Sequence, residues 1–238
     1  MYSFQSRVRY SEVGVDQYLT LPSILNYYQD CSNFQSEEYG VGIDYLTKQR
    51  SFWVVSSWQV KILRRPKLGE EITIGTWPHA LKGFFGLRNF VIRDREGNDL
   101  AQAETVWTYL DMDKMRPKKV EDNLKDIYKL EDPIPGEWKG RKIPKPEGGE
   151  EMEPITVGKF LLDTNGHVNN EKYVLIAMEY VPKDFQISYL RVEYKAQARY
   201  KDVIVPVVTK TEDVITVSLN RENGETFTVI EFERGTKC

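Results

Sequence analysis

The stretches "WQVKILRRPKLGEEI" (residues 58–72) and "LRVEYKAQARYKDVI" (residues 190–204) decide the fold. Each begins with the strict apolar/polar alternation of a half-buried strand and then breaks at a basic turn before a second strand begins. At a constant offset, the residues that correspond are Trp58 and Leu190, Val60 and Val192, Ile62 and Tyr194, Lys67 and Arg199, Glu70 and Asp202, and Ile72 and Ile204. Such self-similarity indicates an internal duplication.

The similarity continues on the C-terminal side of each stretch. Residues 91–107 and residues 218–233 each read as a strand, a tight turn that contains glycine, and another strand. The same hairpin therefore follows in each half, and we expect each half to hold about four antiparallel strands.

One helix is expected before the strands of each half. In the first half, Thr20 is the predicted N-cap and Pro22 lies in the first turn. In the second half, a helix is expected at 168–181, and its run from Tyr173 to Met178 is continuously apolar, which is typical of a helix buried on all sides. The pattern predicts an α+β fold with one buried helix in each half. The apolar residues that recur at helical spacing in the first helix are Leu21, Ile24, Leu25, Tyr28, Cys31 and Phe34.

A proline-rich segment separates the two halves. Residues 117–154 hold six of the eleven prolines and little periodicity, apart from a short helical possibility at 123–130. This composition is typical of a linker that runs over the surface. We therefore expect an N-terminal domain at 1–116, the linker at 117–154 and a C-terminal domain at 155–238.

Composition narrows the class of protein. The chain has 238 residues, a net charge of −3 and a hydrophobic content of 40%, which are ordinary values for a soluble globular protein and do not favour nucleic-acid binding. No apolar run approaches the roughly 20 residues of a membrane span, and the N-terminus lacks the apolar core of a signal peptide. The two cysteines cannot build a disulfide framework. We expect a cytoplasmic protein.

The segment "DTNGHVNN" (residues 163–170) gathers proton-handling and hydrogen-bonding groups before the second helix. Asp163 and Asn165 stand at alternate positions, so both can point to one side. If the helix begins near Val168, His167 lies at its N-terminus, where free backbone N–H groups favour negative charge. A carbonyl could be polarised there while His167 or Asp163 activates water or attacks. This arrangement suits ester or thioester cleavage.

Three other interpretations compete for this segment. A calcium loop of the EF-hand type fails, because Gly166 comes too early and Val174 stands where a glutamate is needed. A zinc site would need further ligands, and only His79, Cys31 and Cys238 remain. A capped turn, whose Asp and Asn side chains bond the local backbone, stays open. His79 itself follows a proline, and we expect it to be an exposed turn residue.

The sequence resembles one enzyme family along both halves. "DTNGHVNNEKYVLIAMEYV" resembles the D-x-N-x-H-V-N-N-x-x-Y motif of acyl-acyl-carrier-protein thioesterases, and "FWVVSSWQVKILRRPKLGEEITIGTW" and "LRNFVIRDREGNDLAQAETVWTYLDMDKMRP" resemble two further stretches of that family. The resemblance implies a tandem hot-dog fold, in which each half wraps an antiparallel sheet around a long central helix. It also implies hydrolysis of the thioester between a fatty acyl chain and the phosphopantetheine arm of acyl carrier protein, which ends fatty acid synthesis.

The motif also implies roles for single residues. Asp163 would be the catalytic carboxylate, as base or nucleophile, and Asn165 and His167 would orient the partners and stabilise developing charge. The residues expected to bind the substrate are Asn169, Asn170, Trp53 and Trp58.

One departure concerns the family's E-Y-x-x-E-C segment, whose Glu and Cys have been assigned catalytic roles. Here the segment reads "EYKAQA", so that Gln197 and Ala198 replace them. Gln197 can at most hold the attacking water by hydrogen bonding. We expect Cys31 to be a core residue, which leaves Cys238 as the other thiol, and we assign the attack to the aspartate of the motif or to its water. Glu193 is an alternative carboxylate.

Acyl carrier proteins are acidic, so a basic docking surface is expected. Arg64, Arg65 and Lys67 are the first candidates for it. The other basic clusters that could serve are Lys118 and Lys119, and Lys139, Arg141, Lys142 and Lys145. We expect no cofactor, no metal, no nucleic-acid or membrane partner, and either a monomer or a homodimer. Two rivals remain, a hot-dog thioesterase that acts on acyl-coenzyme A and a non-catalytic protein that binds the acyl chain or the carrier.

Overall fold

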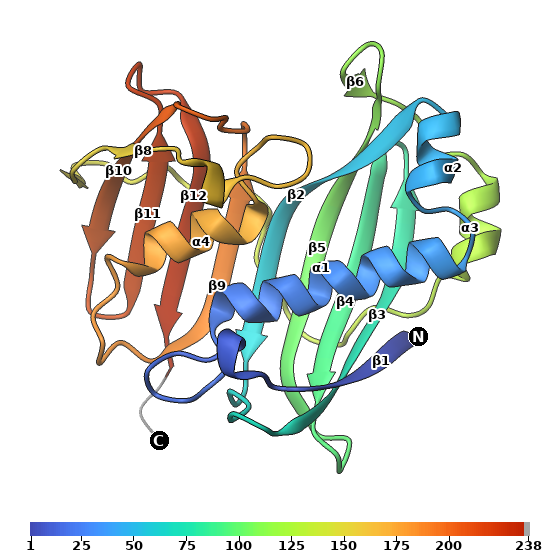
Figure 1. Ribbon diagram of the computed structural model, residues 1–238, viewed down its shortest axis with the longest axis horizontal. Coiled ribbons are helices and arrows are strands. Elements are labelled where there is room, and N and C mark those ends of the chain that lie inside the picture. The colour runs from blue at the N-terminus through green and yellow to red at the C-terminus, as the bar shows by residue number, and fades with distance from the viewer. Residues whose placement is uncertain (236–238) are drawn as a thin grey trace. The chain divides into compact units, whose positions relative to one another are not determined.

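The computed structural model describes residues 1–235. The chain divides into two compact units, the first from Met1 to Lys139 and the second from Gly140 onward. Each unit has its own antiparallel strands and its own main helix (Figure 1). None of the helices in this part of the chain is both long and apolar enough to cross a membrane.

The sheet of the first unit has the strand order β1-β3-β4-β5-β2, and β6 pairs with β5. All these pairs are antiparallel. The hairpin predicted at 91–107 is confirmed, because β4 and β5 pair and turn at residues 94–98. The strands of this unit are β1 (Tyr2–Arg7), β2 (Ser51–Ile62), β3 (Glu71–Lys82), β4 (Phe85–Arg93), β5 (Asp99–Asp111) and β6 (Arg116–Pro117).

Helix α1 (Leu21–Glu38) crosses one face of this sheet (Figure 1). The predicted start is confirmed, since Thr20 Oγ1 accepts a hydrogen bond from the Ser23 N–H at 3.3 Å. Pro22 occupies the first turn, where its missing N–H leaves no hydrogen bond unmade. These two residues fix where the chain turns into the helix.

The apolar side of α1 packs onto the sheet through aromatic rings. Tyr28 and Trp58 of β2 are both buried and stack with ring centroids 6.0 Å apart. Phe90 of β4 completes the group, 5.0 Å from the Tyr28 ring. Phe34, predicted to belong to the apolar side of this helix, is instead 47% exposed. Its ring contacts Phe4 of the edge strand β1.

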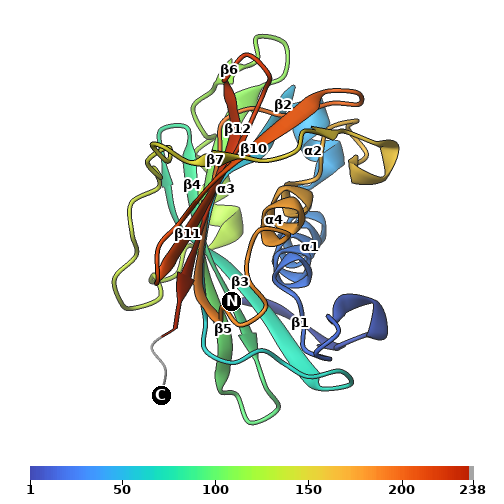
Figure 2. The same ribbon diagram turned by 90° about the vertical axis from the view of Figure 1, so that its left-hand side faces the viewer.

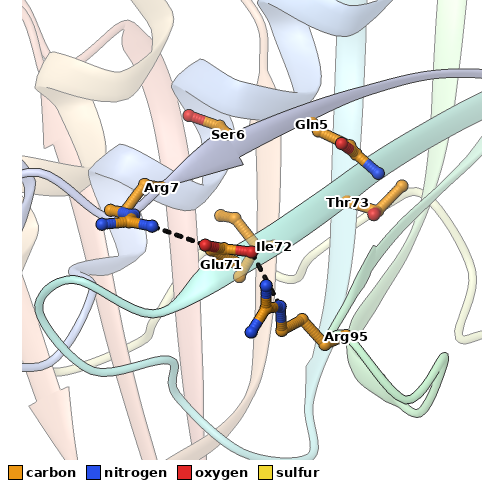
Figure 3. A pocket seen from close by; sticks show the side chains of 7 residues that line it. All are labelled: Gln5, Ser6, Arg7, Glu71, Ile72, Thr73 and Arg95. Atoms are coloured by element: carbon orange, nitrogen blue, oxygen red, sulfur yellow. Dashed lines mark hydrogen bonds and ion pairs between the residues drawn. The ribbon is translucent and has the colours of Figure 1, made fainter.

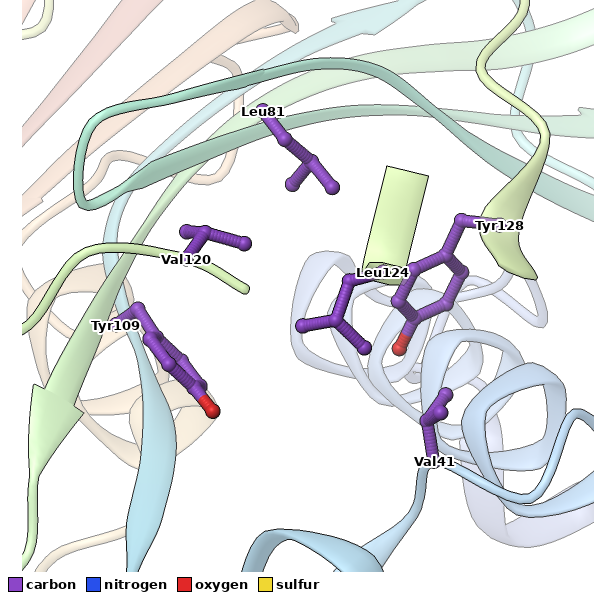
Figure 4. Close-up of a cluster of buried hydrophobic side chains, with 6 residues drawn as sticks. All are labelled: Val41, Leu81, Tyr109, Val120, Leu124 and Tyr128. Atoms are coloured by element: carbon purple, nitrogen blue, oxygen red, sulfur yellow. The ribbon is translucent and has the colours of Figure 1, made fainter. Parts of the chain in front are cut away.

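Part of the predicted linker packs into the first unit. Helix α3 (Asn123–Tyr128), predicted at 123–130, is confirmed and presents Leu124 and Tyr128 to a buried cluster. Helix α2 (Ile43–Lys48) adds the partly buried Leu46. Apolar side chains from the segment are therefore core residues, which its proline-rich composition concealed. Figure 4 shows the cluster, which consists of Val41, Leu81, Tyr109, Val120, Leu124 and Tyr128.

The prediction that His79 is an exposed turn residue is wrong. His79 lies inside β3, its side chain is 9% exposed, and its Nε2 lies 3.4 Å from Glu104 Oε1. The neighbouring Pro78 marks a break in the register of β3 and β4, between Pro78 and Ala80. Proline is tolerated within a strand at such a bulge, so it did not signal a turn here.

The second unit has the strand order β9-β12-β11-β10-β7, and β8 pairs with β10. The hairpin predicted at 218–233 is confirmed as β11 and β12. The strands of this unit are β7 (Glu150–Glu151), β8 (Ile155–Thr156), β9 (Ile187–Tyr194), β10 (Val203–Lys210), β11 (Val214–Asn220) and β12 (Thr226–Arg234).

Helix α4 (Asn170–Met178) is shorter than the helix predicted at 168–181. Its start is delayed because Val168 still belongs to the preceding loop, where its N–H donates to the Ala198 carbonyl at 2.9 Å. The helix is not buried on all sides either. Leu175 is 41% exposed, whereas the charged Glu171 is 5% exposed.

The predicted duplication is confirmed by the backbone hydrogen bonds. A short 3₁₀ helix, η1 (Tyr10–Glu12) in the first unit and η2 (Lys159–Leu161) in the second, leads into a hairpin-like loop before the main helix. The loops use the same donor and acceptor positions. The corresponding pairs, first unit then second, are Gly14–Tyr18 and Asp163–His167, Leu19–Pro66 and Val168–Ala198, Thr20–Glu12 and Asn169–Leu161, Val8–Glu70 and Val157–Asp202, and Glu70–Lys67 and Asp202–Arg199.

Each unit is therefore one helix laid on a twisted antiparallel sheet. Figure 2 shows α1 and α4 each on a single face of the strands of its own unit. In the second unit, α4 packs against β11 and β12. This is the hot-dog arrangement, present twice in one chain, with a long helix in the first unit and a short one in the second.

Candidate functional site

The loop between η2 and α4 is held by the side chain of Asp163. Its Oδ1 accepts hydrogen bonds from the N–H groups of Asn165 at 2.8 Å and His167 at 3.1 Å. The Asp163 N–H in turn donates to the His167 carbonyl at 2.7 Å, and Gly166 supplies the positive φ of +75° that the turn requires. The capped turn that the sequence left open is thus present. It uses one carboxylate oxygen and leaves Oδ2 available.

Two isolated bridges arrange the candidate residues on one surface. Leu162 pairs with Val168, and His167 pairs with Arg199, both antiparallel. Because neighbouring residues of an extended chain point to opposite faces, Val168 turns to the buried side while its neighbour His167 turns to the other. The residues whose alternation places them on the same side as His167 are Asp163, Asn169, Gln197 and Arg199.

The exposure of these side chains fits that alternation. Val168 and Ala198 are buried, at 3% and 0% exposure. Asp163 and His167 are half-buried, and Asn165 is exposed. Asp163 and His167 thus belong to one hydrogen-bonded loop with both side chains half-buried, whereas the Asn165 amide lies in solvent. Gln197 is also exposed.

Two tyrosines tie this loop to the rest of the second unit. The Tyr173 hydroxyl of α4 accepts a hydrogen bond from the Ala198 N–H at 2.8 Å. The Tyr194 hydroxyl of β9 donates to the Asn170 carbonyl at 2.9 Å. Burial raises the pKa of Tyr173 to about 12, so this hydroxyl stays neutral at physiological pH. Helix, loop and strand end are thus fixed to one another.

The start of α4 carries the other predicted residues of the motif. Asn169 is the N-cap residue, but its side chain makes no capping hydrogen bond. Asn170 is the first helical residue. The N–H groups of the first turn are therefore not covered by a cap side chain, and such groups favour negative charge. Glu171 lies within this first turn and is paired with Lys172 at 2.7 Å.

The two tryptophans predicted to bind substrate lie in the first unit and differ in burial. Trp58 is 1% exposed, and its Nε1 has no hydrogen-bond partner within residues 1–235. Trp53 is partly buried and packs on Tyr109, with ring centroids 4.7 Å apart. Trp53 also lies against Gly86, where a Cβ would come within 3.1 Å of the indole.

The three basic residues predicted to dock a carrier protein already have partners. Arg64 pairs with Glu70 at 2.6 Å. Arg65 donates to both carboxylate oxygens of Asp16, at 2.7 and 3.3 Å. The Lys67 ammonium lies 5.7 Å from the centre of the Tyr18 ring. Exposed pairs of this kind are weak, so the residues can still meet an acidic partner.

A second basic surface, which the sequence analysis did not select, lines a hollow of about 570 Å³ in the first unit (Figure 3). Arg7 and Arg95 both pair with Glu71, the latter at 2.8 Å. Two guanidinium groups therefore share one carboxylate. The remaining lining residues are Gln5, Ser6, Ile72 and Thr73.

The alternative attacking groups are poorly placed for chemistry. Cys31 is buried in the first unit, and burial raises the pKa of its thiol to about 12. Cys238 lies outside the described residues. Glu193 Oε2 accepts a hydrogen bond from the Ile143 N–H at 3.0 Å and pairs with Lys195 at 3.5 Å. Both contacts use the same carboxylate oxygen, so Glu193 already has structural partners.

Three residues near the loop were missed by the sequence analysis. Tyr173 and Tyr194 lie within apolar or alternating runs, and nothing local distinguishes a bridging hydroxyl from a packed ring. Arg199, which pairs directly with His167, could have been found. It occupies the position of Lys67 in the duplicated stretch, beside a loop that precedes a helix in both halves.

Comparisons with known proteins place this site in context. The profile of the acyl-ACP thioesterase N-terminal domain matches residues 1–128, and that of the acyl-ACP thioesterase C-terminal domain matches residues 145–235. Oleoyl-acyl carrier protein thioesterase 1 of Arabidopsis thaliana is 25% identical over 87% of this chain and 63% of its own. Palmitoyl-acyl carrier protein thioesterase of Gossypium hirsutum is 25% identical over 91% of this chain and 58% of its own. The chain thus spans less than two thirds of these relatives.

Solved structures show the same fold over nearly the whole chain. An acyl-ACP thioesterase from Bacteroides thetaiotaomicron has a TM-score of 0.91 and 21% identity, covering 98% of this chain and 97% of its own. The 12:0-ACP thioesterase from Umbellularia californica has a TM-score of 0.86 and 20% identity, covering 99% and 97%. With both family profiles matched in order along the sequence, the chain belongs to the acyl-ACP thioesterase family.

Proposed function

We propose that this protein hydrolyses the thioester of fatty acyl-acyl carrier protein and releases a free fatty acid, with its reaction centre in the second unit. The observation that carries the proposal is the loop before α4. There the Asp163 carboxylate is fixed through one oxygen by two backbone N–H groups and lies on the same side as His167. A carboxylate and an imidazole beside an uncapped helix start can attack a carbonyl and stabilise the charge that develops.

Asp163 has the groups needed for either form of attack. Its Oδ2 can add to the thioester carbonyl carbon, or it can take a proton from a water that adds instead. The first-turn N–H groups of α4, which no cap side chain covers, stabilise the resulting oxyanion in this proposal. The carbon–sulfur bond then breaks, and the pantetheine sulfur takes up a proton and leaves as a thiol. If water attacked, the fatty acid forms directly; if Oδ2 attacked, a mixed anhydride with Asp163 forms, and water then cleaves it to release the fatty acid and restore the carboxylate.

His167, Asn165 and Gln197 have supporting roles in this proposal. The His167 imidazole exchanges protons with the attacking water and the leaving sulfur. Asn165 and Gln197 donate hydrogen bonds to the water or the acyl carbonyl. Attack by a thiol is disfavoured at Cys31, because a thiol whose pKa is about 12 forms almost no thiolate at neutral pH.

The substrate and carrier contacts are extensions of the same proposal. Asn169 and Asn170 border the reacting group from the start of α4, and Trp53 and Trp58 contact the acyl chain. The carrier docks on basic side chains of the first unit, Arg64, Arg65 and Lys67. We infer further that the protein acts in the cytoplasm. Its curated plant relatives are named as chloroplastic.

The test compares substrates and site variants in one assay. Release of fatty acid and thiol is followed with acyl-acyl carrier protein and with acyl-coenzyme A of equal chain length, using wild type, Asp163→Asn and His167→Ala. We expect hydrolysis by wild type, preference for the carrier protein, and losses of about 10²-fold or more in both variants. Comparable rates in all three proteins would remove the loop from the mechanism.

The two rivals give distinct results in the same assay. A hot-dog enzyme that acts on coenzyme A would prefer the free coenzyme thioester. A non-catalytic protein would bind the acyl chain or its carrier, without turnover, in wild type and variants alike. Folding of each variant is checked by its urea unfolding midpoint, so that loss of activity is not mistaken for loss of structure.

A further inference from the structure

The first unit contains a loop, residues 14–20, that corresponds to the candidate-site loop at 163–169, and the Arg65 side chain fills its centre. We call the loop at 14–20 the closed copy. In the correspondence set by the backbone hydrogen bonds, Gly14, Asp16, Tyr18 and Thr20 occupy the positions of Asp163, Asn165, His167 and Asn169. The first unit therefore lacks the carboxylate and the imidazole. Its backbone still follows the same course, including a positive φ of 63° at Gln17 where the second unit has Gly166.

Arg65 fills the centre of this closed copy. Its Nε donates to the Leu19 carbonyl at 2.8 Å, and its Nη2 donates to the Tyr18 carbonyl at 3.0 Å. Its two Nη atoms also reach the Asp16 carboxylate at 2.7 and 3.3 Å. A single guanidinium thus satisfies two backbone carbonyls and one side chain, and it closes the space between them.

In the second unit no guanidinium stands at the corresponding position. Gln197 stands where Arg65 stands, with a shorter side chain and no charge, and Asn165 replaces Asp16. The carbonyl oxygens of His167 and Val168 correspond to those of Tyr18 and Leu19. Within residues 1–235, neither of these two carbonyls accepts a hydrogen bond from a side chain, and the side chains of Asn165 and Gln197 are both exposed.

We propose that the space which the Arg65 guanidinium fills in the first unit is, in the second unit, a subsite for the amide N–H groups of the substrate's pantetheine arm. This inference rests on the proposed function. The arm carries amide N–H groups, and the loop offers acceptors at His167 O, Val168 O and the Asn165 amide oxygen. In the first unit the N–H groups of Arg65 donate to the corresponding carbonyl oxygens, of Tyr18 and Leu19, which shows that donors can reach this position.

The acceptors of the two loops differ in charge. The first unit pairs a cation with a carboxylate, Arg65 with Asp16. In the second unit the equivalent acceptor, Asn165, is neutral. A neutral amide can donate to it and to the two carbonyl oxygens without a counter-charge.

The test rebuilds the closed arrangement in the second unit. The double variant Asn165→Asp with Gln197→Arg places the guanidinium and its carboxylate partner in the corresponding positions. Hydrolysis is measured with octanoyl-pantetheine, which has amide groups, and with S-ethyl thiooctanoate, which has none. The readout is the ratio of kcat/KM for the two substrates, because any effect on the chemical step common to both cancels.

We expect wild type to favour octanoyl-pantetheine, and the double variant to lose that preference by on the order of tenfold through a higher KM. Asn165→Asp alone leaves the space open and keeps an acceptor, so its ratio stays within about twofold of wild type. An unchanged ratio in the double variant overturns the subsite. Absence of hydrolysis of any thioester by wild type, acyl-acyl carrier protein included, overturns the proposed function instead.

A binding measurement covers the case in which the double variant does not fold. S-methylpantetheine and ethyl methyl sulfide are titrated into wild type by calorimetry. The subsite predicts binding of the first and no binding of the second at the same concentration. Equal behaviour of the two ligands contradicts it, with no need for turnover.

Discussion

The hydrogen bond from the Ala198 N–H to the Tyr173 hydroxyl allows a quantitative prediction for Tyr173→Phe. Both residues are buried, with exposures of 0% and 1%, and the bond is 2.8 Å long. Phenylalanine fills nearly the same space, so no cavity forms, but the Ala198 N–H is left without a partner. An unsatisfied buried donor costs about 1–3 kcal/mol. We therefore expect the free energy of unfolding to fall by about 2 kcal/mol.

The same change acts on the candidate site, because Ala198 also accepts the Val168 N–H and is followed along the chain by Arg199, the partner of His167. Stability is measured by urea unfolding, where the midpoint shifts and the slope stays constant. The matched control is Tyr194→Phe, which removes a donor from a carbonyl that keeps a second lone pair, and we expect it to cost about 1 kcal/mol. Equal losses in the two variants, or a loss below about 0.5 kcal/mol in Tyr173→Phe, would refute this reasoning.

Three further predictions follow from single residues. Lys201 adopts a φ of 70°, and its counterpart in the first unit, Gly69, has a φ of 79°. Because only glycine adopts such angles without strain, we expect Lys201→Gly to raise the free energy of unfolding by about 0.5–1 kcal/mol and Gly69→Ala to lower it by about 1–2 kcal/mol. Thermal and urea unfolding measure both changes. Burial raises the pKa of the Cys31 thiol from 9.0 to about 12 on folding. The unfolded chain therefore releases this proton at a lower pH than the folded chain, and the free energy of unfolding falls from pH 9 upward. We expect Cys31→Ala to flatten this decline when urea midpoints are measured across that pH range; an unchanged decline would contradict the prediction. Leu124 of α3 is 1% exposed, so Leu124→Ala should cost about 2–4 kcal/mol in urea unfolding, whereas a surface-lying segment would lose almost nothing.

Much of the fold was predictable because the decisive signals are local. The alternation from Trp58 and from Leu190, the glycine turns of the two hairpins and the Thr20–Pro22 helix start each depend on a few neighbouring residues. Repetition of the same order of signals made the duplication predictable as well. Nothing beyond the sequence was needed to expect one helix and one antiparallel sheet in each half.

The errors arise where packing decides between equally local alternatives. Proline beside His79 is compatible with a turn and with a bulge, and only the register of β3 and β4 selects the bulge. The helix predicted at 168–181 is longer than α4, which begins only at Asn170. The Val168 N–H is instead used by the Ala198 carbonyl, a residue distant in the sequence.

The candidate site was found through the spacing of Asp163, Asn165 and His167, but its supports were not. The Asp163 carboxylate accepts hydrogen bonds from its own loop, and a short-range sequence motif can predict such local bonds. The hydroxyls of Tyr173 and Tyr194 bond to segments far away along the chain. Such partners depend on the fold, so composition and spacing could not have identified them.

Because the two loops have the same backbone hydrogen bonds, the polar side chains of the second loop could be introduced into the first unit. Four side-chain exchanges, Gly14→Asp, Asp16→Asn, Tyr18→His and Arg65→Gln, would transplant the polar set of the second loop onto a backbone that already has its shape. A protein engineer could thus ask whether one chain supports two reaction centres without redesigning a single turn.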